Sequence, residues 1–164
     1  MKIIKYFFEF IFIYTLLIIF KIIGYKNASN VGAIIGKKIG PLFRSNTEIK
    51  KNLENSNIGN SSEDRNYIIN KMWGNYGRIL SEYIFLKQFR KNNLNKFIEI
   101  EGLEYLDKIK KNKEQVVFIS GHFNNFELMA MQIEKVGIKL AAIYRPLNNK
   151  FLNPKMEYIR KKYI

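Results

Sequence analysis

The chain contains a single histidine, His122, and a carboxylate, Glu127, follows it five positions later. A short run at residues 116–119 precedes the pair, and its β-branched and aromatic side chains are typical of a buried strand. Gly121 then allows a sharp turn, because glycine tolerates positive φ. Positions five apart point in different directions on one helix. We therefore predict that His122 lies in the turn and Glu127 in the first turns of the next helix, from which its carboxylate reaches the imidazole.

A carboxylate that fixes the tautomer of a histidine and stabilises its cation makes that histidine a better general base. Because the chain has no cysteine and no second histidine, the expected nucleophile is a hydroxyl group of the substrate. This pattern predicts transfer of a group to an alcohol. One alternative stays open, in which Asn124 and Glu127 form a helix-capping arrangement and His122 is a hydrogen-bonded structural residue.

The residues around this pair resemble a known family. Residues 121–128 read G-H-F-N-N-F-E-L, which is similar to the G-H-F-x-N-W-E-L block of the late lipid A acyltransferases, the lauroyl and myristoyl transferases. That block is their version of the H-x4-D/E signature of glycerolipid acyltransferases. Phe126 replaces the usual Trp, which exchanges one aromatic ring for another. Further segments resemble the family in the same order along the chain: residues 73–78 with Glu82, residues 101–106, residues 144–149 and Arg160.

The resemblance implies transfer of a fatty acyl chain to a hydroxyl of a lipid A precursor in lipopolysaccharide biosynthesis. It implies that His122 is the general base, that Glu127 orients it, and that Arg145, Arg160 and Asn125 bind substrate. The donor would be an acyl thioester of acyl carrier protein or of coenzyme A, with no cofactor. For Arg145 an exposed turn residue is the alternative to a guanidinium that binds phosphate with two parallel hydrogen bonds.

Residues 97–100, 116–119 and 139–144 have strand-like sequences, and helix-like segments separate them. This alternation predicts an α/β domain with a parallel or mixed sheet and flanking helices, as in glycerolipid acyltransferases. Sites in such sheets form at the carboxyl ends of strands, so His122 and Arg145 are expected to open into one crevice. Members of the family are considerably longer, so we expect a truncated chain that lacks the C-terminal part of the domain.

An apolar and aromatic run at residues 10–20 predicts a membrane anchor. A spanning helix needs about 20 residues, and residues 3–23 provide this length if Lys5, Glu9 and Lys21 lie near the ends or extend toward water. No small-residue cleavage site comes after it, so we predict an uncleaved anchor that spans the bilayer or lies in one leaflet. Basic residues continue after the anchor, which predicts that the following catalytic domain lies on the cytoplasmic face. The family resemblance implies that the membrane is the bacterial inner membrane.

We therefore predict an anchor at residues 1–24, a helical segment at residues 25–95 and the first part of the acyltransferase domain at residues 96–164. Three glycines in the helical segment are spaced four apart: Gly32, Gly36 and Gly40. This spacing favours either close packing against another helix or a flexible connector. Further along, Arg78 and Glu82 are predicted to form an exposed ion pair one helical turn apart. The alternative is that Arg78 lies under the active site.

The formal net charge of +14 favours an anionic partner, either nucleic acid or an acidic membrane surface. The family resemblance selects a lipid acceptor and an acidic acyl carrier protein, and not nucleic acid. The absence of cysteine excludes a disulfide framework, and a single histidine argues against a zinc site. Two rival functions stay open: a glycerol-phosphate or lysophospholipid acyltransferase with the same chemistry, and a non-catalytic, truncated basic protein associated with membranes.

Overall fold

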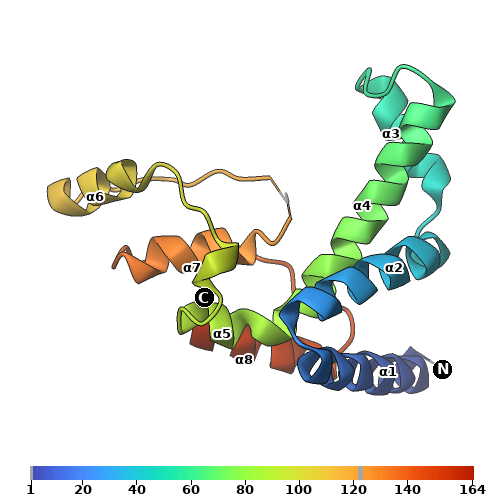
Figure 1. The fold of residues 1–164 in the computed structure, drawn as a ribbon, viewed down its shortest axis with the longest axis horizontal. Coiled ribbons are helices and arrows are strands. Elements are labelled where there is room, and N and C mark those ends of the chain that lie inside the picture. Colours follow the sequence, from blue (N-terminus) through green and yellow to red (C-terminus); the bar gives the residue numbers. More distant parts are fainter. Residues whose placement is uncertain (1, 122–123) are drawn as a thin grey trace. The chain divides into compact units, whose positions relative to one another are not determined.

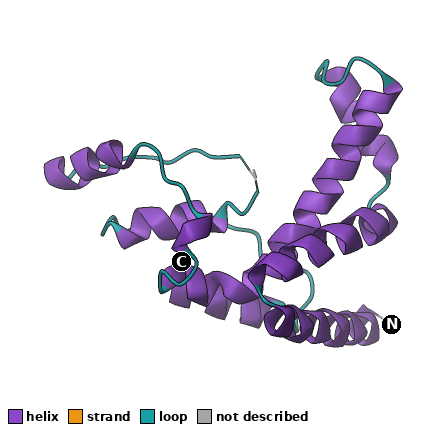
Figure 2. Ribbon diagram, in the orientation of Figure 1, coloured by secondary structure: helices purple, strands orange, loops and turns teal. Residues whose placement is uncertain are grey.

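The structure is a computed structural model that describes residues 2–121 and 124–164, with Phe43 described by its backbone alone. Helices and connecting loops make up all of this described part (Figures 1 and 2). In chain order the elements are α1 (Lys2–Ile23), α2 (Tyr25–Phe43), α3 (Asn46–Asn55), α4 (Ser62–Glu82), η1 (Tyr83–Phe85), α5 (Leu86–Arg90), η2 (Asn95–Phe97), α6 (Leu103–Asn112), α7 (Glu127–Lys135) and α8 (Asn153–Tyr163).

The predicted parallel or mixed sheet is wrong, because no strand occurs among the described residues (Figure 2). A strand is stable only when a neighbouring strand pairs with its backbone. The strand-like segments find no such neighbour in the described chain, and several of their apolar side chains face solvent. Val117, Ile119 and Ile143 are 87%, 92% and 106% exposed. The β-branched residues therefore identify segments that are suited to a strand. They do not show whether a second strand is present to pair with each segment.

The chain forms two compact units. One comprises α1 as far as Thr15 together with Phe85–Ile164, and the other comprises Leu16–Ile84. Helix α1 contributes residues to both units, so the boundaries predicted after residues 24 and 95 stay predictions. The predicted site residues that the structure describes, Asn125, Glu127, Arg145 and Arg160, belong to the first unit.

In the Leu16–Ile84 unit, α2 packs along α4 through glycines (Figure 1). A methyl group added at Gly32 or Gly36 would come closer than 3.0 Å to the backbone of Gly77 or Trp73. A methyl group at Gly40 would collide with the indole ring of Trp73. The absence of side chains allows the two helix backbones to approach each other closely. The predicted close packing of the glycine stripe is thus confirmed, and the alternative of a flexible connector is wrong.

Replacing Gly77 by Ala should destabilise this helix pair by about 1–3 kcal/mol, the usual cost of overpacking a tight contact. The new methyl group would lie closer than 3.0 Å to the carbonyl group of Gly32, where only backbone can yield. Gly74→Ala is the matched control, because its methyl group would meet only the flexible side chain of Lys37. Alanine also favours a helix over glycine by about 1 kcal/mol. Thermal unfolding followed by circular dichroism should show a lower Tm for Gly77→Ala alone; equal effects would contradict the packing.

A polar cluster fixes the register of α2 on α4. The Ser29 hydroxyl donates a hydrogen bond of 2.7 Å to the carboxylate of Glu82, and Glu82 is only 8% exposed. The Arg78 guanidinium donates to Ser29 and to Asn30, each at 3.0 Å. Burial, together with the nearby charge of Glu82, raises the pKa of Tyr25 to about 12. The prediction of an exposed Arg78–Glu82 pair is therefore wrong, since both side chains engage α2.

Candidate functional site

The start of α7 places the predicted catalytic carboxylate, because Glu127 is its first residue. Asn124 adopts a left-handed conformation with φ of 47°, and the Phe126 amide donates to the Asn124 carbonyl at 3.1 Å. Phe126 is the N-cap, and no side chain provides a capping hydrogen bond there. The alternative in which Glu127 serves a capping arrangement is therefore wrong. His122 lies outside the described residues, so its predicted approach to Glu127 stays a prediction.

Glu127 is paired with Arg160 of α8. Two nitrogens of the Arg160 guanidinium, Nε and Nη2, donate to the same carboxylate oxygen, Oε1, at 2.9 and 2.6 Å. The Glu127 side chain is only 7% exposed, and that of Arg160 is 28% exposed. A buried carboxylate requires compensation of its charge, and charge-assisted hydrogen bonds of this kind are short and strong. Arg160 therefore stabilises the carboxylate of Glu127 and fixes its orientation.

Residues 144–147 are tied to the same helix. The Arg160 guanidinium lies over the Tyr144 ring, 5.2 Å from its centroid, which is a favourable cation–π distance. The Tyr144 hydroxyl and the Asn153 amide each donate to Glu157 Oε1 at 2.8 Å. The hydrogen bond from Tyr144 lowers the pKa of Glu157 and raises the pKa of Tyr144. Asn153 also accepts a 2.8 Å hydrogen bond from the Leu147 amide, so this loop is fixed on α8.

Of the other predicted site residues, Asn125 and Arg145 lie in the described part of the chain. Arg145 is exposed, and none of the hydrogen bonds or ion pairs found between described residues involves it. Asn125 is half-buried in the turn before α7. Because the described chain has no sheet, it has no strand edge of the kind at which His122 and Arg145 were expected to meet. The structure thus brings together two predicted residues, Glu127 and Arg160.

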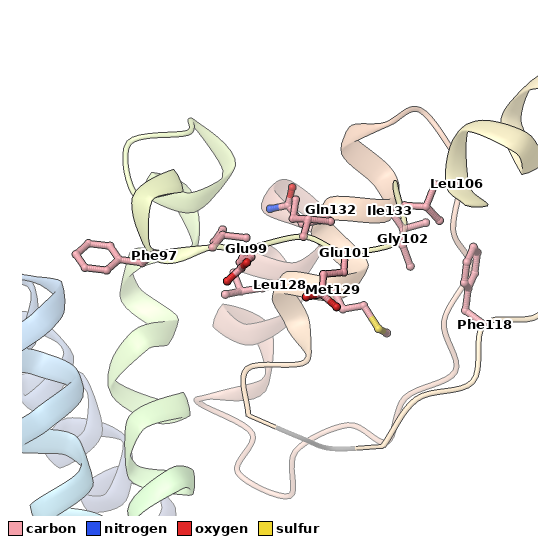
Figure 3. Close-up of a pocket in the computed structure, with 12 residues that line it drawn as sticks. Phe97, Glu99, Glu101, Gly102, Leu106, Phe118, Leu128, Met129, Gln132 and Ile133 are labelled. Carbon is pink, nitrogen blue, oxygen red and sulfur yellow. The ribbon is translucent and has the colours of Figure 1, made fainter. Parts of the chain in front are cut away.

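An open cavity of about 510 Å³ lies beside α7 (Figure 3). One wall is formed by residues 97–102, and another by the side of α7 that carries Leu128, Met129, Gln132 and Ile133. Most of the lining side chains are apolar, including those of Leu106, Phe118, Leu128, Met129 and Ile133. Its volume falls within the range of about 300–1,000 Å³ that is usual for ligand sites. Because α7 supplies both Glu127 and part of the lining, one helix positions the carboxylate and the cavity.

The family model for bacterial lipid A biosynthesis acyltransferases matches residues 1–163. The chain belongs to this family. The predicted resemblance is therefore confirmed, and the protein is an acyltransferase of lipid A biosynthesis at the level of the family. No curated protein and no solved structure shows a significant match.

In this lipid A acyltransferase, the contact between Glu127 and Arg160 was not predicted from the sequence. Arg160 lies 33 residues after Glu127, and no local spacing predicts a contact over that distance. The link between Asn153 and Glu157 could have been predicted, because residues four apart are neighbours on a helix. The contact between Tyr144 and Glu157 could not have been predicted, because it depends on how the loop before α8 folds back onto that helix.

Proposed function

We propose that this lipid A acyltransferase moves a fatty acyl chain from a thioester donor to a hydroxyl group of a lipid A precursor. The observation that carries the proposal is the family match across residues 1–163. The environment of Glu127 supports it. A carboxylate at the start of a helix, buried and held in one orientation by Arg160, suits a residue that must orient a catalytic group.

In the proposed reaction His122 removes the proton from the acceptor hydroxyl, and the oxygen attacks the carbonyl carbon of the thioester. The carbon–sulfur bond then breaks, and the departing thiolate receives the proton from the imidazolium. Glu127 orients His122 and stabilises its cation. Arg160 holds Glu127, and its direct binding to substrate stays a prediction. Arg145 and Asn125 bind substrate, and the exposed guanidinium of Arg145 is suited to a phosphate group.

The acyl chain occupies the cavity beside α7. Support comes from its apolar lining, to which α7 contributes Leu128, Met129 and Ile133. A hydrocarbon chain gains free energy when it leaves water for such a surface.

The proposed donor is acyl carrier protein, and the proposed setting is the cytoplasmic face of the inner membrane. An acidic carrier protein would be attracted by a chain with a formal net charge of +14. Basic residues after α1, including Lys26, Lys37 and Lys38, favour a cytoplasmic location for the part of the chain beyond the anchor. The family's place in lipid A biosynthesis supports a membrane setting.

A panel of donors and acceptors tests this assignment. The purified full-length protein is incubated with acyl carrier protein or coenzyme A thioesters, and with either a lipid A precursor or a lysophospholipid. We expect faster turnover with the carrier-protein thioester and acylation of the lipid A precursor only. A dephosphorylated precursor should show a raised KM, because Arg145 would lose its ligand. Preferred acylation of the lysophospholipid would overturn the proposed acceptor.

A further inference from the structure

One side of helix α1 is apolar and exposed, and its other side is partly covered by protein. It is the one helix among the described residues that is long and apolar enough to cross a membrane, with a mean hydropathy of 2.1. Most of its large exposed side chains lie on one side and are 45–78% exposed: Ile3, Ile4, Phe8, Ile11, Phe12, Ile18, Ile19 and Ile22. Phe7 and Tyr14, which also meet Phe151 and Lys155, are 46% and 40% exposed. The less exposed residues recur every three or four positions: Tyr6, Glu9, Phe10, Ile13, Leu16, Leu17 and Phe20. Such a repeat means that something covers one side of α1 along its length.

A polar side chain covers part of this side. Asn149 is only 7% exposed, and its amide donates to the Tyr6 carbonyl at 2.9 Å and to the Glu9 carboxylate at 3.2 Å. Glu9 also lies 3.8 Å from the ammonium group of Lys5. Tyr6 and Glu9 thus face protein groups rather than lipid in the first half of α1.

The contacts continue further along the helix. The Phe151 ring meets the Phe7 ring edge-on with centroids 5.7 Å apart, and its centroid lies 6.1 Å from that of Phe10. The Lys155 ammonium lies 6.0 Å from the centroid of the Tyr14 ring. Residues from the start of α8 and the loop before it therefore lie against α1 as far as its middle.

These contacts conflict with a helix that crosses the bilayer. The covered stretch from Tyr6 to Tyr14 extends about 12 Å along the axis, and residues 15–23 add only about 13 Å beyond it. A bilayer has a hydrocarbon core of about 30 Å, so a crossing would require nearly the whole of α1. Asn149 and Lys155 would then enter the core together with α1. Polar and charged groups are unfavourable at that depth.

We infer that α1 lies along the surface of one leaflet, with its exposed apolar side in the hydrocarbon and its covered side against residues 149–155. An interfacial helix buries its apolar face about 5–10 Å below the headgroups. The formal net charge of +14 and the cations of α8, among them exposed Lys161 and Lys162, fit the anionic headgroups of such a leaflet. The sequence left a spanning and a one-leaflet anchor open, and the contacts of Asn149 and Lys155 favour the second.

Single cysteines test the topology cleanly, because the chain contains no cysteine. Lys2→Cys and Lys26→Cys flank α1, and Lys161→Cys marks the face on which α8 lies. Each full-length variant is treated with a membrane-impermeant maleimide in spheroplasts and in inside-out vesicles. We expect all three cysteines to be labelled from the same side. Labelling of Lys2→Cys and Lys26→Cys from opposite sides would overturn the inference.

A depth measurement excludes a helix that stays in water. Ile4, Ile11 and Ile18 are exposed and seven positions apart, so they lie on the same side of α1. A fluorophore on a cysteine at each position should be quenched most by lipids brominated at the same shallow position of the acyl chain. A spanning helix would separate successive labels by about 10 Å in depth. Such a separation, or no quenching, would overturn the inference. Neither measurement needs turnover, so its failure would not bear on acyl transfer.

Discussion

His122→Ala is expected to lower kcat by roughly 100- to 10,000-fold, the usual contribution of a positioned general base. Without the imidazole, no proposed side chain accepts the proton of the acceptor hydroxyl. An unperturbed imidazole titrates near ~6.5, so the rate of the unmodified protein should fall as acid protonates His122. The slow residual rate of the variant should lose this dependence. Both are measured as acyl transfer by purified protein across a pH series.

Ser120→Ala is the matched control, because it removes a nearby hydroxyl that bonds only the exposed Gly121 carbonyl in the described chain. Its turnover should stay close to that of the unmodified protein. Near-normal acyl transfer by folded His122→Ala protein would end the general-base assignment.

Glu127→Gln is expected to reduce turnover by roughly 100-fold or more, since the carboxylate that orients a catalytic histidine in other enzymes contributes up to about 10,000-fold. The amide keeps the shape of the side chain and removes its charge. Stability should fall as well, because the two short hydrogen bonds from the Arg160 guanidinium would go to a neutral amide oxygen and lose the assistance of the negative charge. Turnover is measured with a saturating donor, and unfolding is followed by circular dichroism.

A double variant separates the two roles of Glu127. Arg160→Gln alone leaves a buried carboxylate without its guanidinium and should cost about 1–3 kcal/mol. Combining Glu127→Gln with Arg160→Gln leaves two amides that can bond each other, so most of the stability should return. Turnover should stay low, because the charge that orients His122 is still absent. Recovery of turnover together with stability would mean that Glu127 serves only the ion pair.

Local rules predicted the helices well. At the start of α4 the Ser61 hydroxyl accepts from the Asp64 amide at 3.0 Å, and the Asp64 carboxylate accepts from the Ser61 amide, which is the contact that a serine followed three positions later by a carboxylate makes. Close packing of α2 on another helix was one of the two alternatives that the spacing of the helical glycines indicated. Both signals act over a few residues, so the amino-acid sequence contains all the information that they require.

The sheet and the contacts of the site could not be predicted in the same way. The strand-like pattern around Val117 describes side chains, whereas a strand also depends on a partner distant in the chain. The pairing of Glu127 with Arg160 likewise depends on where α8 lies, and no spacing encodes it. The burial of Glu82 could not be predicted either. Its neighbours in the sequence are typical of an exposed charge, yet it lies buried against Ser29.

Mass spectrometry of the acceptor lipid tests the central claim most directly. Purified full-length protein, unmodified or carrying His122→Ala, is incubated with a lipid A precursor and an acyl carrier protein thioester. We predict that the unmodified protein adds the mass of one fatty acid less one water to the precursor, through an ester bond. In the same time the variant should leave almost all of the precursor unchanged. If the folded, unmodified protein leaves the precursor unchanged with both the carrier-protein thioester and the coenzyme A thioester, the proposed acyl transfer is contradicted.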